Sequence, residues 1–277
     1  MTIELRLRIC FIAEHGLCFL VEAEGKKLLF DTGQSAKTLV NIHKLGIDLG
    51  AVDYAVISHG HYDHSGGYRT LIDNDLHCQL YTGADFLRKR FSNNDGELKY
   101  LGVDFDPVYL EQHEIKHITC GEFTALSENI FIMSCFSRNN SFENVPSRFI
   151  YEEADGSYLH DLFENEVCLV FRENNALNVV VGCSHIGIAN ILSKISIFFN
   201  LPIKYVFGGI HLKEATDDVA RHTIDAVLAL GVENLYFNHC SGDDVLKLLI
   251  GSESSDTDKH RLFKTGYLAA GASFSTL

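Results

Sequence analysis

The sequence has 277 residues, of which 46% are hydrophobic and 22% charged, as in a soluble globular protein with a substantial core. Its net charge of −14 argues against nucleic acid or an anionic membrane as the partner, because both attract a basic surface. We find no apolar run of membrane-spanning length, no signal peptide and no C-x-x-C pair among the eight cysteines. We therefore expect a cytoplasmic protein with reduced thiols that acts on a small molecule.

The first part of the chain predicts an antiparallel meander. Apolar segments at residues 3–13, 17–23 and 27–30 are separated by turns, and a helix is predicted over 35–45. The third segment delivers Asp31 at its end. Asp31 either caps the helix that follows or lies behind a metal-binding histidine, hydrogen-bonding its ring and fixing the tautomer.

The next strand, predicted over 52–57, leads into a cluster of metal-binding residue types. His59, His61, Asp63 and His64 fall within six positions, and neutral imidazoles with a carboxylate are ligands that suit zinc or iron. Histidines two apart on an extended segment point the same way, so His59 and His61 can share one ion. Asp63 and His64 lie further round the turn and can reach a second. A short helix over 68–72 and a strand over 76–81 follow.

Residues 84–160 are less regular and predict an insertion or lid. The basic run 88–90 fits either a solvated helix face or a contact with substrate phosphate. Strands are predicted at 115–119 and 130–135. The polar stretch 137–144 is a binding loop or a simple surface excursion, and Arg138 and Phe142 are its candidate substrate contacts.

The last part of the chain repeats one pattern, in which a predicted strand ends in a histidine. A hairpin of strands 167–171 and 177–181 ends near Cys183 and His185, and further strands at 203–207 and 234–237 end near His211 and His239. Helices are predicted over 187–199 and 217–230. A shared metal site at one sheet edge explains this recurrence best.

These residues together resemble the metallo-β-lactamase superfamily. The resemblance rests on the strand end at Asp31, the His59-x-His61-x-Asp63-His64 motif and the later strand-end histidines. Three runs are similar to the branch containing the archaeal 7,8-dihydropterin-6-yl-methyl-aminobenzene ribofuranosyl phosphate synthases: Gly-Cys-Ser-His-Ile-Gly at 182–187, Gly-Gly-Ile-His-Leu at 208–212 and His-Cys-Ser-Gly at 239–242. The resemblance implies an α/β fold, a four-layer αβ/βα sandwich, formed by residues 1–277 as a single domain with the insertion around 84–160.

The resemblance also implies a ligand set. His59, His61 and a later histidine would hold one divalent ion, and Asp63, His64 and His239 a second. Cys183 stands at the position where many relatives have a bridging aspartate, so His185 is the better candidate for the later histidine. If Cys183 is the ligand instead, His160 or His211 is the nearest additional imidazole. Zinc is the default metal, with Fe, Mn or Mg as alternatives.

The implied activity is hydrolysis of an ester or phosphoester-type small molecule, with a phosphorylated substrate as one option, through a metal-activated water. Asp63 would ligate, orient and take the proton. His211 is either a structural histidine or a donor to the leaving group. The alternatives are a C–N bond-forming transferase whose metals bind a diphosphate leaving group, and a non-catalytic effector. The oligomeric state does not follow from the sequence.

Overall fold

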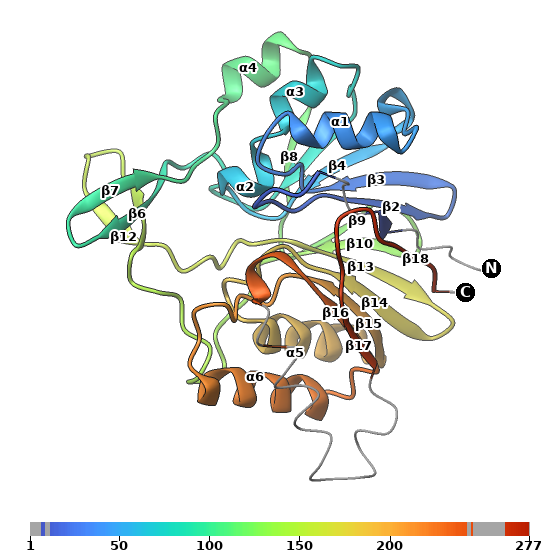
Figure 1. Ribbon diagram of the computed structural model, residues 1–277, viewed down its shortest axis with the longest axis vertical. Coiled ribbons are helices and arrows are strands. Elements are labelled where there is room, and N and C mark those ends of the chain that lie inside the picture. Colours follow the sequence, from blue (N-terminus) through green and yellow to red (C-terminus); the bar gives the residue numbers. More distant parts are fainter. Residues whose placement is uncertain (1–6, 9–11, 243–244, 246–263, 277) are drawn as a thin grey trace. The chain divides into compact units, whose positions relative to one another are not determined.

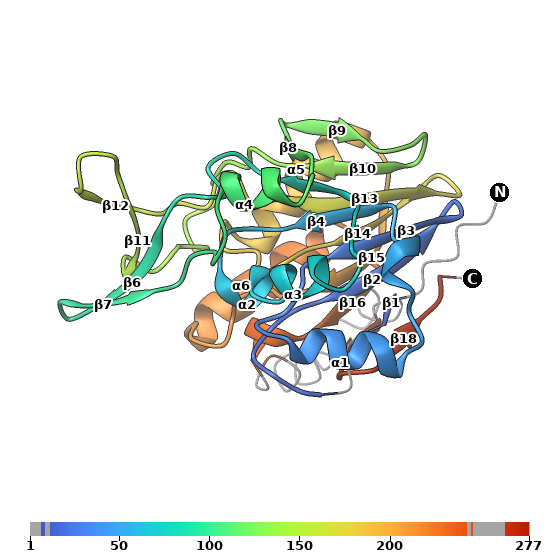
Figure 2. The same cartoon turned by 90° about the horizontal axis from the view of Figure 1, so that it is seen from above.

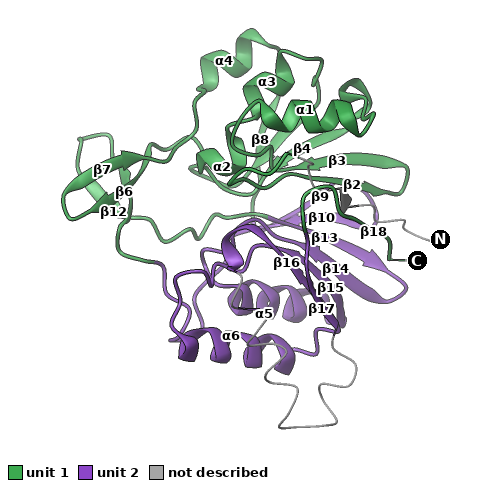
Figure 3. Ribbon diagram, viewed as in Figure 1, with its two compact units in different colours: residues 1–121, 146–167, 269–277 green, residues 122–145, 168–268 purple. Residues whose placement is uncertain are grey.

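The computed structural model describes residues 7–8, 12–242, 245 and 264–276. The described chain forms two compact units (Figure 3). Unit 1 comprises residues 1–121, 146–167 and 269–277, and unit 2 comprises residues 122–145 and 168–268. Most of the segment predicted as a first strand over 3–13 lies outside the described residues, which retain β1 (Leu7–Arg8) from it.

Unit 1 is built on a mixed sheet that has seven strands among the described residues, in the order β18-β1-β2-β3-β4-β5-β8. The strands from β18 to β3 are antiparallel, whereas β3, β4, β5 and β8 run parallel to one another. This change lets several strands deliver their carboxyl ends to the same sheet edge. The remaining strands are β2 (Phe19–Ala23), β3 (Lys26–Phe30), β4 (Tyr54–Ile57), β5 (Gln79–Thr82), β8 (His117–Thr119) and β18 (Ser273–Phe274).

Helices cover one face of this sheet (Figure 1). They are α1 (Lys37–Lys44), α3 (Tyr68–Ile72) and α4 (Pro107–Gln112), joined by the 3-10 turn η1 (Leu49–Ala51) and the single turn α2 (Tyr62–Ser65). Ile42, Tyr68 and Leu110 pack on Leu29, Ile57 and Leu80 of the strands in one apolar cluster. Burial of this apolar surface, at roughly 25 cal/mol per Å², fixes the strand ends beside it.

The insertion contains a small antiparallel sheet of order β12-β11-β6-β7, which the sequence did not predict. Its strands are β6 (Arg90–Asn94), β7 (Glu97–Tyr100), β11 (Phe149–Glu152) and β12 (Tyr158–His160). It extends away from the larger sheet of unit 1 in both views (Figures 1 and 2). The solvated-helix interpretation of the basic run is wrong for Arg90, because that residue begins β6 and is 7% exposed.

Unit 2 repeats the plan of sheet and helices. Its described strands form the order β17-β16-β15-β14-β13-β10-β9, with β14 to β17 parallel. They are β9 (Phe123–Ala125), β10 (Ile130–Met133), β13 (Cys168–Glu173), β14 (Ala176–Val180), β15 (Ile203–Gly208), β16 (Asn234–Phe237) and β17 (Lys264–Tyr267). The 3-10 turn η2 (His239–Ser241) lies between β16 and β17 in the chain. Helices α5 (Ile188–Phe199) and α6 (Asp217–Ala229) pack on the sheet through residues such as Ile191 and Ile224.

The predicted α/β class is confirmed in both units. The hairpin between β13 and β14 turns at Asn174 and Asn175, which both have positive φ, as a two-residue hairpin turn of mirror-image type requires. Among the residues that the structure describes, no helix combines the length and the apolar character needed to cross a membrane.

Candidate metal centre

Residues at the carboxyl ends of several strands have a left-handed backbone. Asp31 follows β3 with φ 58°, Ser184 follows β14 with φ 59°, His211 follows β15 with φ 46°, and His239 follows β16 with φ 55°. Such φ values are uncommon outside glycine and cost of order 1–3 kcal/mol when the rest of the structure imposes them. Four of the fourteen described non-glycine residues with positive φ therefore follow the strands that end near the predicted metal-binding residues.

In unit 1 the predicted metal-binding residues lie together. His59 and His61 are 4.7 Å apart between ring centroids, and His59 and His64 are 4.2 Å apart. The Oδ2 atom of Asp63 lies 3.8 Å from Nε2 of His64. All of these residues are buried, His64 completely. The motif that follows β4 therefore gathers three imidazoles and a carboxylate at one sheet edge.

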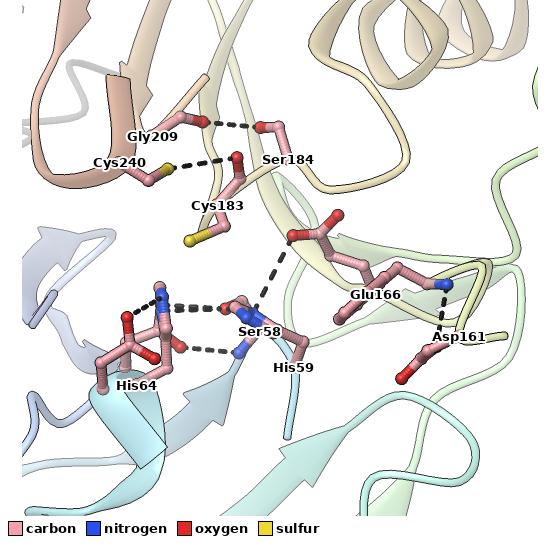
Figure 4. A network of polar contacts seen from close by, with 12 residues as sticks. Ser58, His59, His64, Asp161, Glu166, Cys183, Ser184, Gly209 and Cys240 are labelled. Carbon is pink, nitrogen blue, oxygen red and sulfur yellow. Dashed lines mark hydrogen bonds and ion pairs between the residues drawn. The ribbon is translucent and has the colours of Figure 1, made fainter. Parts of the chain in front are cut away.

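One buried carboxylate, that of Asp31, organises two of these histidines. Figure 4 labels both histidines and Ser58, which links one of them to Asp31. Asp31 accepts hydrogen bonds from Nδ1 of His64 at 2.6 Å, from the backbone N–H of Ser58 at 2.7 Å and from the Ser58 hydroxyl at 2.9 Å. Since that hydroxyl gives its hydrogen to Asp31, its oxygen accepts from Nδ1 of His59 at 2.9 Å. Both rings then carry their hydrogen on Nδ1, and Nε2 is the nitrogen that can bind a metal.

This arrangement excludes one of the two sequence interpretations of Asp31. Helix α1 begins at Lys37 with Ala36 as its N-cap, so Asp31 does not cap it, and the capping interpretation is wrong. The left-handed backbone of Asp31 instead turns its carboxylate toward the residues that follow β4. Its own N–H donates to the carbonyl of Val56 at 2.8 Å, which ties the end of β3 to β4.

The loop that carries the histidines requires glycine at two positions. A Cβ on Gly60 would collide with the carbonyl oxygen of Phe86 and with Nη1 of Arg90, and a Cβ on Gly67 would collide with the carbonyl of Thr32. Thr32 in turn donates its N–H to the carbonyl of His64 at 2.7 Å. Glycine therefore permits the close approach of the loop to Phe86 and Arg90 at Gly60, and to Thr32 just after β3 at Gly67.

Two further features of unit 1 surround the histidines. The exposed His15 places Nε2 3.4 Å from Oδ2 of Asp63, an approach made by the turn between β1 and β2. Phe149 and Phe163 pack against the ring of His61 at centroid distances of 5.5 and 5.1 Å. The aromatic rings limit the motion of His61 and exclude water from one side of it.

A pocket of about 160 Å³ in unit 1 borders His59 and Gly60. A buried ion pair lines it, in which Nε of Arg90 lies 2.7 Å from Oδ2 of Asp161. Its wall also includes Arg88, whose guanidinium stacks 4.5 Å from the ring centre of Tyr151. Arg88 and Arg90 of the basic run thus line a pocket beside His59, although Arg90 is already paired with Asp161.

In unit 2 the residues after β14 form a second cluster. The ring centroids of His185 and His211 are 4.3 Å apart, and His185 is buried. The Ser184 hydroxyl donates to the carbonyl of Gly209 at 2.8 Å, and the Cys240 thiol lies 3.5 Å from the carbonyl oxygen of Cys183 (Figure 4). The loops after β14, β15 and β16 are therefore bonded to one another at this sheet edge.

His239 opens the 3-10 turn after β16. The hydroxyl of Ser241 closes this turn by donating to the carbonyl of Asn238 at 2.7 Å, and it accepts the N–H of Ile210 at 3.1 Å. A cavity of about 480 Å³ in unit 2 is lined by His239 together with Lys213, Asp217 and Tyr267. The three predicted strand-end histidines of unit 2 thus occupy loops that are fixed by hydrogen bonds.

The loop 137–144 is anchored to α5. The buried Glu143 accepts the N–H groups of Ala189 at 2.9 Å and Asn190 at 3.1 Å, so it satisfies donors of the first helical turn. Burial raises the pKa of Glu143, and the hydrogen bonds it accepts oppose that rise. Arg138 is half-buried in this loop, and the Phe142 ring lies 5.9 Å from that of His222. The contact of Arg138 and Phe142 with substrate stays a prediction.

The donor set in unit 1 fits a divalent transition metal. It provides three neutral imidazoles, two with the tautomer fixed, and a carboxylate, which is the chemistry that zinc, iron and manganese accept. Ligand histidines in proteins commonly donate their second ring N–H to a carboxylate or another acceptor, as His64 and His59 do here.

Some of these groups had not been assigned a role from the sequence. Ser58 stands next to the motif and could have been suspected for that reason. Glu166 lies 3.9 Å from Nδ1 of His59 and immediately precedes the strand predicted over 167–171. The start of one strand can lie beside the end of a neighbouring strand, and this position is the signal that could have identified Glu166. His15 and Glu143 act over 48 and 46 positions of sequence (63 − 15 and 189 − 143), so no local pattern reveals them.

Comparison with known proteins agrees with this architecture, and the chain belongs to the metallo-β-lactamase superfamily. The model of that superfamily matches residues 12–75, which include Asp31 and the histidine motif. The solved structure of Tm1679, described as a metal-dependent hydrolase of the β-lactamase superfamily, is 30% identical. It aligns over 98% of both chains with a TM-score of 0.81.

Two proteins of Methanocaldococcus jannaschii are also similar. One is 7,8-dihydropterin-6-methyl-4-(β-D-ribofuranosyl)-aminobenzene-5′-phosphate synthase, 27% identical over 84% of this chain and 82% of the synthase. The other, the uncharacterised MJ0448, is 29% identical over 78% of this chain and 79% of its own. The relatives of this chain therefore include a metal-dependent hydrolase and a synthase, and the expected superfamily is confirmed.

Proposed function

We propose that this protein is a dinuclear-metal-dependent hydrolase of a small ester or phosphoester. The observation that carries the proposal is the pair of imidazoles whose tautomers are fixed by Asp31, directly for His64 and through the Ser58 hydroxyl for His59. A buried carboxylate that orients two neighbouring histidines is expected where both histidines bind a metal through Nε2. The similarity to a metal-dependent hydrolase over almost the whole chain supports the same conclusion.

The residues have the following proposed roles. When bound, divalent ions of this kind polarise substrate oxygens and lower the pKa of water toward neutrality. His59, His61, Asp63 and His64 are the proposed ligands after β4, and Asp63 is also the proposed proton acceptor at Oδ2. His185 and His239 are proposed as further ligands, with Cys183 as an additional candidate.

The remaining roles concern the substrate. His211 donates a hydrogen bond or a proton to the leaving group, and Arg138 and Phe142 contact the substrate. The substrate is a small molecule, and a phosphorylated one suits the arginines best. Zinc is the proposed metal, with Fe, Mn and Mg as alternatives. A cytoplasmic location stays a prediction from the sequence.

A second candidate function is C–N bond formation. The similarity to the M. jannaschii synthase favours it, since that relative is similar over most of both chains. In this case the same ligand residues would bind ions that neutralise a diphosphate leaving group, and an aryl amine would take the place of water. A non-catalytic effector on the same fold is the third candidate.

Oxygen-18 labelling separates these candidates. The zinc-, manganese- and iron-loaded protein is incubated in H₂¹⁸O with panels of esters, lactones and phosphoesters, and separately with diphosphate esters plus an aryl amine. Incorporation of ¹⁸O into product supports the hydrolase. A joined organic product with release of diphosphate would replace it with the transferase. The absence of turnover in both panels, with metal bound, favours an effector.

A further inference from the structure

A second buried carboxylate lies next to the histidine motif of unit 1. The side chain of Glu166 is 1% exposed, and that of His59 is 2% exposed. Oε1 of Glu166 lies 3.9 Å from Nδ1 of His59, as the dashed line in Figure 4 shows. Neither the sequence motif nor the assignment of ligands above gives Glu166 a role.

The backbone around Glu166 is fixed to the strands that carry the motif. Val167 donates its N–H to the carbonyl of Ser58 at 2.8 Å, and Glu166 donates to the carbonyl of Phe163 at 3.1 Å. The carbonyl of Asn165 lies against Gly83, where a Cβ would overlap it. The segment is therefore held between the ends of β4 and β5, and the direction of the Glu166 side chain follows from that placement.

The position of Glu166 favours one tautomer of His59. The hydrogen on Nδ1 is donated to the Ser58 hydroxyl, and the carboxylate lies on the same side of the ring. A negative charge there stabilises the positive end of the ring dipole, and it opposes the tautomer that would place a lone pair on Nδ1. Both side chains are buried, so the interaction is weakly screened.

We propose that Glu166 is a positioning residue for His59, which it holds with Nε2 presented to a divalent metal and made a stronger donor. His64 receives this support from Asp31 by direct hydrogen bonding, whereas His59 is linked to Asp31 through the Ser58 hydroxyl. Glu166 adds a second negative charge near Nδ1 of His59. The inference rests on the metal-binding part of the proposed function.

Metal affinity tests the inference without reference to turnover. The metal-free protein is titrated with Zn²⁺ against a chromophoric chelator, and Co²⁺ binding is followed by its visible absorption. Glu166→Gln keeps the shape of the side chain and removes its charge, so it should weaken binding about 10–100-fold. Glu166→Asp keeps the charge and should recover part of that loss.

Glu173→Gln is the matched control, because Glu173 is also a buried carboxylate, 8% exposed, and bonds Asn178 in the β13–β14 hairpin. It should leave metal affinity unchanged. Thermal unfolding of each metal-free variant distinguishes a variant that does not fold from one that folds but binds metal weakly. If Glu166→Gln does not fold, Glu166→Asp is used for the test, and its zinc affinity should fall 10-fold or less.

Binding by Glu166→Gln within about twofold of the wild type, or equal losses in the Gln and Asp variants, overturns the inference and leaves the proposed function intact. A loss of more than 100-fold in Glu166→Asp also overturns it, since that variant retains the charge. Failure of the wild-type protein to bind zinc overturns the proposed function itself, together with the inference.

Discussion

At the scale of single residues, one aspartate determines the chemistry of two histidines. Asp31 is fully buried, and its side-chain hydrogen-bond partners among the described residues are Ser58 and His64. Its two carboxylate oxygens thus accept hydrogen bonds from the Ser58 backbone N–H, the Ser58 hydroxyl and the His64 ring. The proposed ligands therefore derive their tautomers from a group that does not itself touch the metal.

The first prediction concerns Asp63. Asp63→Asn retains the shape of the side chain but loses the charge and the ability to accept a proton. Activity toward an ester identified in the labelling experiment should fall about 10²–10⁴-fold, the usual contribution of a positioned acid–base group. Steady-state kinetics measure this. Asp53→Asn, which removes a surface ion pair with Lys26, is the control and should retain activity. Near-complete activity of Asp63→Asn would show that the proton goes elsewhere.

The second prediction separates His185 from Cys183. An imidazole binds metal at neutral pH without losing a proton, whereas a thiol must first ionise. His185→Ala should therefore lose at least one metal ion, and Cys183→Ser should keep one ion while binding the second more weakly. Elemental analysis gives the stoichiometry, with the exposed His77→Ala as control. The reverse result would make Cys183 a ligand and leave His160 or His211 as its partner.

At the scale of elements, the small sheet depends on a buried ion pair. Arg90 at the start of β6 and Asp161 just after β12 are each 8% exposed at the side chain. Removing one partner of such a pair leaves an uncompensated charge, which usually costs 3–5 kcal/mol.

The third prediction follows from this pair. Arg90→Met should lower the free energy of unfolding by roughly 3–5 kcal/mol, measured by urea denaturation. The double variant Arg90→Met with Asp161→Leu removes both charges and should regain most of that loss. Equal stability of the single variant and the wild type would mean that the ion pair contributes nothing.

The fourth prediction concerns Glu143 and pH. Burial raises the pKa of Glu143 above its ordinary value near 4.5, so the folded protein holds this proton more tightly than the unfolded chain. Stability from this group is therefore present below the ordinary value and is lost as pH rises from there through the raised pKa. Unfolding free energies measured at several pH values should show this decrease in the wild type and not in Glu143→Gln. A parallel pH dependence of both proteins would contradict the assignment.

The sequence predicts elements well where apolar periodicity is strong. Helix α3 and strand β16 have the predicted bounds, and the histidine motif follows β4 as expected. The strands of the small sheet were missed because their sequence signals are weak. β7 alternates between polar and apolar residues over only four positions and is exposed at all of them, and β6 has a single apolar residue, Phe91. Long-range pairing rather than local propensity makes them strands.

The candidate site was predictable to the same degree. The ligand residue types and their strand-end positions follow from the chain, since parallel strands bring their carboxyl ends to one edge. The groups that orient them do not follow. The Asp31–Ser58–His59 chain depends on the left-handed backbone at Asp31, and Glu166 reaches His59 across 107 positions (166 − 59).

At the scale of the whole molecule, metal binding should couple to stability. The fifth prediction is that the purified protein contains up to two transition-metal ions per chain and that zinc raises its unfolding free energy. Free zinc at 100 times its dissociation constant stabilises by about 2.7 kcal/mol if only the folded state binds it. Calorimetry before and after chelation measures this. Identical unfolding with and without zinc, or less than a tenth of an equivalent bound after reconstitution, would contradict it.

The pairing of β1 with β18 has a consequence for how the protein is made. Leu7 lies opposite Phe274, a separation of 267 residues (274 − 7), and β18 joins the sheet of unit 1 after the whole of unit 2 has been synthesised. During translation the edge of β1 that pairs with β18 therefore stays unpaired until β18 is synthesised, and it can pair with other chains. Contacts of such long range slow folding. We therefore expect β1 to remain exposed to pairing with other chains until β18 has been synthesised.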